Sequence, residues 1–133
     1  MSGLVLKLGP NECILINGAV IENGGHRSRL VILTPDAHIL RLRDAIRPED
    51  AKTPVRRVCY LVQLVLSGDV EKDKVRQQLV RHIEELSQVF VDSDSRRHLE
   101  RASQFLIAND HYRCLKNLRN LLSREDRLLA AGA

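Results

Sequence analysis

Aromatic residues are scarce in this chain, and tryptophan is absent. The four aromatics present, Tyr60, Phe90, Phe105 and Tyr112, all lie beyond residue 47. Proteins that read single-stranded RNA on a β-sheet stack bases on several phenylalanine or tyrosine side chains of that sheet. Because we expect all four aromatics to lie in the helical half of the chain, the composition argues against recognition of this kind.

Long apolar runs and closely spaced cysteines are also missing. The longest apolar-rich run, Val58–Leu66, is interrupted by Gln63 and is too short to span a bilayer. The first ten residues lack the basic and apolar regions of a signal peptide. Cys13, Cys59 and Cys114 are far apart in apolar surroundings, so we expect buried, reduced thiols. Together these features predict a cytoplasmic protein that does not contact a membrane.

Motifs for metal, cofactor and catalytic sites are missing as well. The five histidines are scattered, and no His-x-x-x-His, Cys-x-x-Cys or His-Glu-x-x-His spacing occurs. A P-loop, a GxGxxG fingerprint and a nucleophile elbow are absent. Glu84-Glu85 and Glu125-Asp126 are neighbours that diverge by about 100° on a helix, so we expect solvated carboxylates and no catalytic dyad. The sequence therefore predicts no metal, no cofactor and no enzymatic activity.

Short apolar segments separated by turn residues fill the chain up to residue 47, which is typical of β-strands. Asn17-Gly18 is a strong hairpin signal, because a type I′ turn needs positive φ at both central residues. We also expect strands 29–34 and 38–42 to pair across Pro35-Asp36. The five antiparallel strands expected are Leu4–Leu8, Cys13–Ile16, Ala19–Glu22, Arg29–Thr34 and His38–Leu42.

Beyond residue 47 the apolar residues recur every three or four positions, as in amphipathic helices. Thr53-Pro54 combines an N-cap with proline at the first helical position and begins a helix that we expect to end at Leu66. Three more helices are expected, the second over about 70–91 and the fourth over about 110–129. With 44% hydrophobic residues the chain can bury a core. We predict an α+β fold, in which a β module of about five strands (residues 1–47) precedes a bundle of about four helices (residues 48–133).

Basic residues gather in the β module of this chain, whose formal net charge is +4. Arg41 and Arg43 alternate on the last strand and so share one face, and Arg29 can approach them if strands 29–34 and 38–42 pair. Arginine contacts phosphate or guanine through two N–H groups at once. The alternative is that arginines on edge strands protect the sheet from aggregation. The candidate RNA-binding residues are Lys7, Arg27, Arg29, Arg41, Arg43 and Arg47.

The hairpin around Asn17-Gly18 is apolar on both faces, whereas a short antiparallel sheet normally keeps one polar face. One face is expected to pack on helices. The other needs either a second copy of the sheet or more of the chain's own helices. The first alternative predicts a homo-oligomer, a dimer or larger, with Ile14, Ile16 and Val20 at the interface.

Several segments, taken in order, resemble one known family over nearly the whole chain. They are Leu6-Lys7-Leu8, Ile16-Asn17-Gly18-Ala19-Val20-Ile21, Asn23-Gly24 and Thr53-Pro54-Val55-Arg56-Arg57, followed by Tyr60 and Gln63. The family is FlbT, the flagellin post-transcriptional regulators of alphaproteobacteria. The resemblance implies a cytoplasmic regulator that associates with the 5′ untranslated leader of flagellin mRNA and represses its translation or promotes its decay. It also implies cooperation with a FlaF-type regulator, and some members act positively.

A second resemblance covers only residues 4–46. Leu4-Val5-Leu6, the segment 9–16 and the segment 34–46 are similar in strand order and arginine placement to CsrA-type RNA regulators. Those regulators are dimers of interlocked five-stranded sheets that read RNA loops from paired edge strands. This likeness implies that Lys7 on the first strand, with Arg41 or Arg43 on the last, contacts RNA.

Two functions from different classes follow. The first is post-transcriptional control of flagellin synthesis, with RNA bound by the β module and protein bound by the helices. The second is a protein-binding adaptor or chaperone-like module of flagellar assembly, acting with a FlaF-type partner or with flagellin, in which effects on RNA are indirect. The basic residues favour the first function, whereas the lack of aromatics for base stacking and the modest net charge favour the second.

Overall fold

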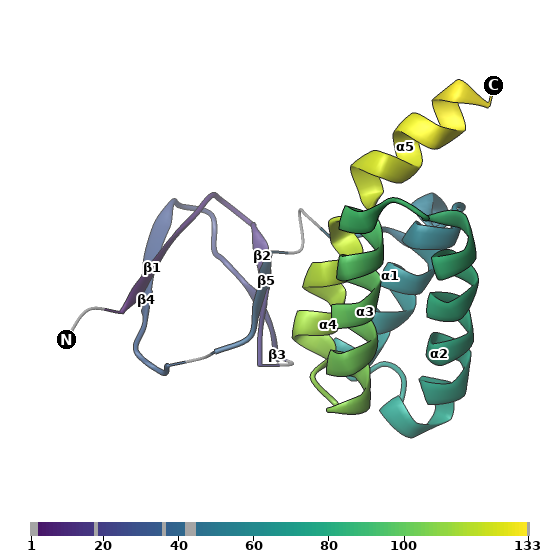
Figure 1. The fold of residues 1–133 in the computed structure, drawn as a ribbon. Helices are drawn as coiled ribbons and strands as arrows, with labels where there is room; N and C mark the ends of the chain where they lie inside the picture. Colours follow the sequence, from purple (N-terminus) through teal and green to yellow (C-terminus); the bar gives the residue numbers. More distant parts are fainter. Residues whose placement is uncertain (1–2, 18, 36, 42–44, 133) are drawn as a thin grey trace. The chain divides into compact units, whose positions relative to one another are not determined.

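The computed structural model describes residues 3–17, 19–35, 37–41 and 45–132. The chain divides into two compact units, Met1–Ala45 and Ile46–Ala133, each of which is described by itself. The first unit holds five short antiparallel strands and the second holds α-helices (Figure 1). The α+β fold expected from the sequence is confirmed, and the division falls after Ala45, just before the expected boundary at residue 47.

The N-terminal unit contains two small sheets. One pairs β1 with β4, and the other places β2 between β3 and β5. Their bounds are β1 Leu4–Leu8, β2 Cys13–Ile16, β3 Ala19–Glu22, β4 Ser28–Ile32 and β5 Ile39–Arg41. The hairpin expected at Asn17-Gly18 is present as the β2–β3 pair, and Asn17 has the positive φ (49°) that such a turn requires. Gly18 itself lies outside the described residues.

The expected pairing of strands 29–34 and 38–42 across Pro35-Asp36 is wrong. β4 pairs with β1, and β5 pairs with the free edge of β2, where Leu40 lies opposite Leu15. The start of β5 is tied to the β2–β3 turn, because the Asn17 N–H donates to the His38 carbonyl and the His38 N–H donates to Asn17 Oδ1, both at 2.8 Å. The apolar strand β2 thus gains a partner on each side, and a local β4–β5 hairpin would have left one of its edges unpaired.

The segment between β1 and β2 connects the two sheets. Asn23 is its main anchor, since its side-chain amide donates to the carbonyls of Gly9 (2.7 Å) and His26 (2.9 Å) and its own N–H donates to the Glu12 carbonyl (2.9 Å). Asn11 adopts φ 59°, a left-handed conformation that asparagine tolerates, and its N–H donates to the Gly24 carbonyl at 2.9 Å. These bonds fix the walls of the cleft described below.

The C-terminal unit begins with a short 3-10 helix, η2 (Pro48–Asp50), and continues with α-helices. Their bounds are α1 Pro54–Leu66, α2 Lys72–Val89, α3 Ser93–Ile107, α4 His111–Arg119 and α5 Leu122–Ala131. Figure 1 shows α1 to α4 packed side by side and α5 leaving one end of that bundle. Among the described residues no helix is both long and apolar enough to cross a membrane.

Helices α1 and α3 begin at side chains that cap them. Thr53 caps α1 by accepting from the Arg56 N–H at 3.4 Å, and Asp92 caps α3 by accepting from the Ser95 N–H at 3.0 Å. The single helix expected over about 110–129 is instead two, because Leu121 N–H bonds to the Leu118 carbonyl (3.0 Å) in a tight turn that separates α4 from α5.

Helix α1 is the centre of this unit, since it contacts α2, α4 and α5. Val55, Val58, Cys59 and Val62 are completely buried. Gln63 is also buried, and its side-chain amide is satisfied by both backbone groups of Ile46, at 2.9 Å and 3.0 Å.

Glu125 contradicts the expectation of a solvated carboxylate, since it is 4% exposed. It accepts hydrogen bonds from the Thr53 hydroxyl and from the Val55 N–H, the latter at 2.8 Å. Its neighbour Asp126 is exposed, as expected, and forms a two-point ion pair with Arg56 at 2.8 and 3.1 Å. A carboxylate from α5 thereby satisfies an N–H at the start of α1, where the helix dipole favours negative charge.

Candidate anion-binding site

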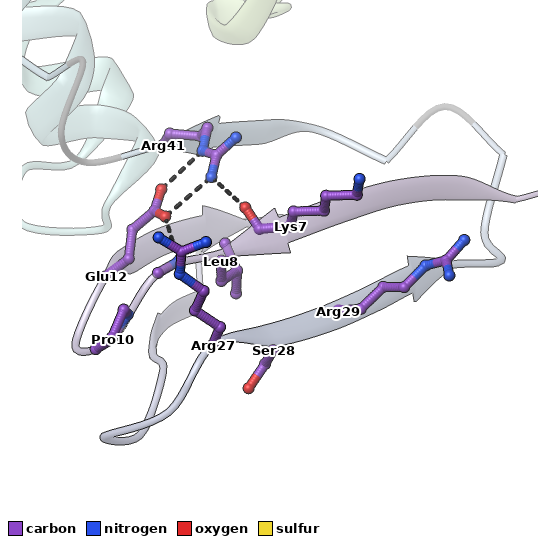
Figure 2. Close-up of a pocket in the computed structure, with 9 residues that line it drawn as sticks. Lys7, Leu8, Pro10, Glu12, Arg27, Ser28, Arg29 and Arg41 are labelled. Atoms are coloured by element: carbon purple, nitrogen blue, oxygen red, sulfur yellow. Dashed lines mark hydrogen bonds and ion pairs between the residues drawn. The ribbon is translucent and has the colours of Figure 1, made fainter.

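The N-terminal unit contains an open cleft of about 520 Å³. The residues that line it come from β1, from the segment that follows β1, from the start of β4 and from β5 (Figure 2). They are Lys7, Leu8, Gly9, Pro10, Glu12, Arg27, Ser28, Arg29 and Arg41. We call this feature the basic cleft, because four of its nine lining residues are cationic and one is acidic.

Two of the cations lie directly opposite each other. Lys7 on β1 and Arg29 on β4 are cross-strand partners, and both side chains are exposed. Arg27, one residue before β4 begins, lines the same cleft and is exposed too. Within the described part of the chain none of the three forms an ion pair. Like charges directly opposite each other on a sheet are destabilising, so this arrangement costs stability unless an anion binds between them.

Arg41 has a different environment from the other three cations. Its guanidinium forms a two-point ion pair with Glu12, with N–O distances of 2.7 and 2.9 Å, and donates to the Lys7 carbonyl at 2.6 Å (Figure 2). The side chains of Arg41 and Glu12 are only 23% and 11% exposed. Glu12 also accepts from the Gly9 N–H at 3.0 Å. Arg41 therefore braces β5 against β1 and the segment after it, and most of its charge is already neutralised.

The chemistry of the basic cleft suits an anion with several oxygen atoms. Lys7, Arg27 and Arg29 are exposed and line the cleft with ammonium and guanidinium groups. Groups of these two kinds form strong hydrogen bonds with phosphate oxygens. The floor includes Leu8, which is 3% exposed. The lining contains no aromatic side chain on which a base can stack.

The six candidate RNA-binding residues thus fall into three groups. Lys7, Arg27, Arg29 and Arg41 meet in the basic cleft, although Arg29 arrives through the β1–β4 pair and not through the expected β4–β5 pair. Arg47 belongs to the C-terminal unit, where it is 72% exposed and pairs with Asp50 (3.1 Å) and Glu49 (3.5 Å). Arg43 lies outside the described residues.

The three candidate interface residues also differ. Ile14 is completely buried, Ile16 is half-buried, and Val20 is 57% exposed. Ile14 and Leu15 point to opposite faces of β2, and both are buried, so β2 is apolar and covered on both faces. Ile14 is consequently a core residue whose side chain is not open to a second copy. Strand β3, which carries Val20 and Ile21, is exposed throughout.

Sequence reasoning missed Glu12, the acid that holds Arg41. Glu12 stands alone between a turn and an apolar strand, and no periodicity marks it. Its role depends on β5 pairing with β2, which brings residues 29 positions apart together. Only a correct strand order could have indicated the ion pair.

The cysteines are not arranged for catalysis or metal binding. Cys59 and Cys114 are buried free thiols, and burial raises the pKa of each to about 12, so both stay protonated and unreactive at neutral pH. Cys13 is a free thiol that is only half-buried, contrary to expectation. No group of three or more histidine, cysteine, aspartate or glutamate residues that could hold a metal ion occurs in the part of the chain the structure describes.

Comparison with known proteins assigns the family. The profile of "Flagellar protein FlbT" matches residues 4–129. A probable flagellum biosynthesis repressor protein FlbT of Rhodopseudomonas palustris is 33% identical over 128 residues, which cover 96% of this chain and 98% of that protein. The corresponding protein of Chelativorans sp. is 30% identical over 127 residues, covering 96% and 86%.

The flagellum biosynthesis repressor protein FlbT of Caulobacter vibrioides is 33% identical over 86 residues. That match covers 65% of this chain and 60% of the Caulobacter protein, so it spans less than two thirds of that relative. No solved structure matches this chain. The resemblance seen in the sequence is confirmed, and the chain belongs to the FlbT family.

Proposed function

We propose that this chain is a post-transcriptional regulator of flagellin synthesis. In this proposal the basic cleft binds the 5′ untranslated leader of flagellin mRNA, and binding represses translation or promotes decay of the message. Membership of a family whose relatives are named flagellum biosynthesis repressors supports a regulatory role. The cationic residues of the cleft support an RNA partner.

The observation that carries the proposal is the opposition of Lys7 and Arg29 on paired strands, with Arg27 lining the same cleft. Charged residues that serve only solubility would be spaced apart or would alternate in sign, because either arrangement removes the repulsion between them. Three cations without ion pairs around an open cleft are instead the electrostatic arrangement that a phosphate group relieves. RNA supplies such groups at every nucleotide.

Binding of this kind depends on the phosphate backbone and not on stacked bases. The unit that contains the cleft has no aromatic residue. We therefore expect a strong dependence on salt, since each phosphate contact releases condensed counterions. Sequence preference must then come from hydrogen bonds of the arginines to base edges or from the shape of the leader.

The test is quantitative binding of the purified full-length chain to flagellin leader RNA over a range of salt concentrations. Lys7→Ala combined with Arg29→Ala should weaken binding at least about tenfold and reduce the salt slope by roughly 0.7 for each phosphate that the variant no longer binds. Arg81→Ala with Arg101→Ala is the matched control, because these arginines are exposed on α2 and α3 and have no ion pair among the described residues. Equal effects of the two double variants would contradict a role for the cleft.

A protein-binding adaptor is the second candidate function. The observation that favours it is that three aromatics of the C-terminal unit, Tyr60, Phe105 and Tyr112, are only half-buried, since aromatic residues are enriched at protein interfaces; the fourth, Phe90, belongs to the core. In this reading the helices engage a FlaF-type regulator or flagellin, and the effect on RNA is indirect. If leader RNA binds the unmodified chain weakly when no protein partner is present, and binds the Lys7→Ala, Arg29→Ala variant equally weakly, the adaptor is favoured.

A further inference from the structure

Every lysine and arginine that the structure describes in the N-terminal unit lines the basic cleft. The cationic residues are Lys7, Arg27, Arg29 and Arg41, and Glu12 is the acid of the cleft. Four cations and one acid leave the cleft with a formal charge of +3. The basic charge of the described part of this unit is thus concentrated in one place and forms no stripe across its strands.

Binding along an RNA backbone requires a different distribution of cations. A single strand carries one negative charge per nucleotide, and proteins that follow its backbone spread their cations along a groove, as OB-folds do over about 4–16 nucleotides. One internal phosphate offsets only about one third of the formal charge of the cleft. The described residues of this unit hold no lysine or arginine outside the cleft that could contact the next phosphate.

The size of the cleft also suits one terminal group better than a run of nucleotides. Its volume of about 520 Å³ lies in the range of about 300–1,000 Å³ that is typical of sites for single small ligands. Its floor includes the buried Leu8, and its lining has no aromatic side chain on which a base can stack. The cleft therefore suits the charged end of a ligand and not its base.

Backbone hydrogen bonds hold the cations in place before a ligand binds. The two cations that face each other in the β1–β4 ladder begin at Cβ atoms about 5 Å apart. Arg27 follows His26, whose carbonyl accepts from the Asn23 amide at 2.9 Å. The same amide donates to the carbonyl of Gly9, another lining residue, at 2.7 Å. A site organised in this way loses little conformational entropy when an anion binds.

A chain of phosphate groups at the end of a nucleotide meets these requirements. It places several negative charges on adjacent groups, each with oxygens for guanidinium and ammonium N–H groups. RNA carries such a chain only at its 5′ end, where transcription leaves the triphosphate of the first nucleotide. We propose that the basic cleft binds a terminal triphosphate group, and that its source is the 5′ end of the flagellin leader. The inference rests on the proposed function, because it names the part of the leader that the cleft contacts.

The charge of the cleft also sets an order of affinity among RNA ends. A 5′-triphosphate supplies the most negative charge, a 5′-monophosphate supplies less, and a 5′-hydroxyl supplies none. The chain should therefore bind a newly made leader more tightly than one whose 5′ end has been processed.

The first test compares leader RNAs of one sequence that differ only at the 5′ end, which is a triphosphate, a monophosphate or a hydroxyl. Affinity for the unmodified full-length chain is measured without magnesium, because that ion binds phosphate oxygens and competes with the cations. The triphosphate RNA should bind at least about tenfold more tightly than the hydroxyl RNA, and its affinity should fall more steeply with salt. This comparison needs no variant, so it does not depend on how a variant folds.

The second test assigns the preference to the cleft. Lys7→Ala combined with Arg29→Ala should remove most of the preference for the triphosphate, whereas Arg81→Ala with Arg101→Ala should keep it. A free nucleoside triphosphate is the competitor that separates the two sources of the group. If it displaces the triphosphate RNA at concentrations equal to that of the RNA itself, the leader adds no affinity, and its 5′ end is overturned as the source.

The outcomes separate this inference from the proposed function. Equal affinity for the three RNAs, with weaker binding by the Lys7→Ala, Arg29→Ala variant, would overturn the triphosphate site and leave RNA binding by the cleft intact. RNA binding that does not depend on these two residues would overturn the proposed function and this inference together. A preference for the triphosphate that survives both substitutions would place the site elsewhere, which also overturns the inference.

Discussion

Glu125 and Asp126 are adjacent acids with opposite surroundings. Glu125 is buried and accepts from Thr53 and Val55, whereas the Asp126 side chain is 56% exposed and pairs with Arg56. The hydrogen bond from the Arg56 guanidinium lowers the pKa of Asp126. Their energetic roles should therefore differ as well.

Glu125→Ala should lower the free energy of unfolding by about 2–4 kcal/mol, because it leaves the buried Val55 N–H and the partly buried Thr53 hydroxyl without their acceptor. Asp126→Ala is the control and should cost less than about 1 kcal/mol, as is usual for an exposed ion pair. Urea denaturation followed by the helical signal measures both values. Equal costs would show that Glu125 is not the residue that secures α5.

His111 predicts a dependence of stability on pH. The residue is 7% exposed, and burial is the main cause that lowers its pKa, with Lys72 and Arg76 contributing, against the Asn109 carbonyl and Asp110, which raise it. The folded state therefore binds a proton less readily than the unfolded chain. The contribution of His111 to stability should be constant above the unfolded pKa of 6.5 and should fall as the pH drops below it.

The measurement is the thermal midpoint at about pH 7.5 and about pH 5. The unmodified chain should lose more stability across this interval than His111→Gln, which has no group to protonate at that position. His26→Gln removes an exposed histidine and should behave like the unmodified chain. If His111→Gln loses as much stability between the two pH values as the unmodified chain, His111 is not the cause of the loss.

At the scale of elements, the Arg41–Glu12 pair is the link between β5 and the segment after β1. Arg41→Ala removes the ion pair and the bond to the Lys7 carbonyl. Amide hydrogens of β5 and of Gly9 should then exchange at least about tenfold faster, because local opening becomes easier. Arg29→Ala is the control, since that arginine has no ion pair among the described residues and its removal relieves repulsion from Lys7.

If Arg41→Ala leaves amide exchange in β5 unchanged, the Arg41–Glu12 pair contributes nothing to the stability of the sheet. The result also affects how RNA binding by Arg41 variants is read. A decrease in affinity that accompanies faster exchange reports a damaged cleft wall. A decrease in RNA affinity without faster amide exchange would report direct contact between Arg41 and RNA.

The helices were predictable because their signals are local. Thr53-Pro54 marks the start of α1, and spacings of three and four identify the buried face of each helix. The break between α4 and α5 was missed because Asn120-Leu121 contains neither glycine nor proline, and the apolar spacing runs through it.

Strand pairing was only partly predictable. The β2–β3 hairpin follows from Asn17, whereas β1–β4 and β2–β5 join segments that are distant in sequence and depend on which edge of β2 is free. The cations of the cleft were found from composition, but the Glu12–Arg41 pair required the pairing of β5 with β2. Non-local contacts are thus what the sequence pattern could not supply.

At the scale of the whole molecule, the basic cleft and the contacts of Glu125 belong to different units. The basic cleft is formed by residues up to Ala45, and Glu125 bonds to the start of α1 among residues from Ile46 onward. Urea denaturation of the Glu125 variant therefore reports the helical unit, and RNA affinity reports the cleft.

The bond between Thr53 and Glu125 has a consequence for synthesis on the ribosome. It joins positions 72 residues apart, whereas the Lys7–Arg41 bond of the β module joins positions 34 apart. The β module can complete its pairings as soon as residue 41 has left the exit tunnel. The start of α1 must wait, with the Val55 N–H open to water, until α5 has been translated. The nascent chain should therefore form its basic cleft well before its helical unit becomes resistant to proteases.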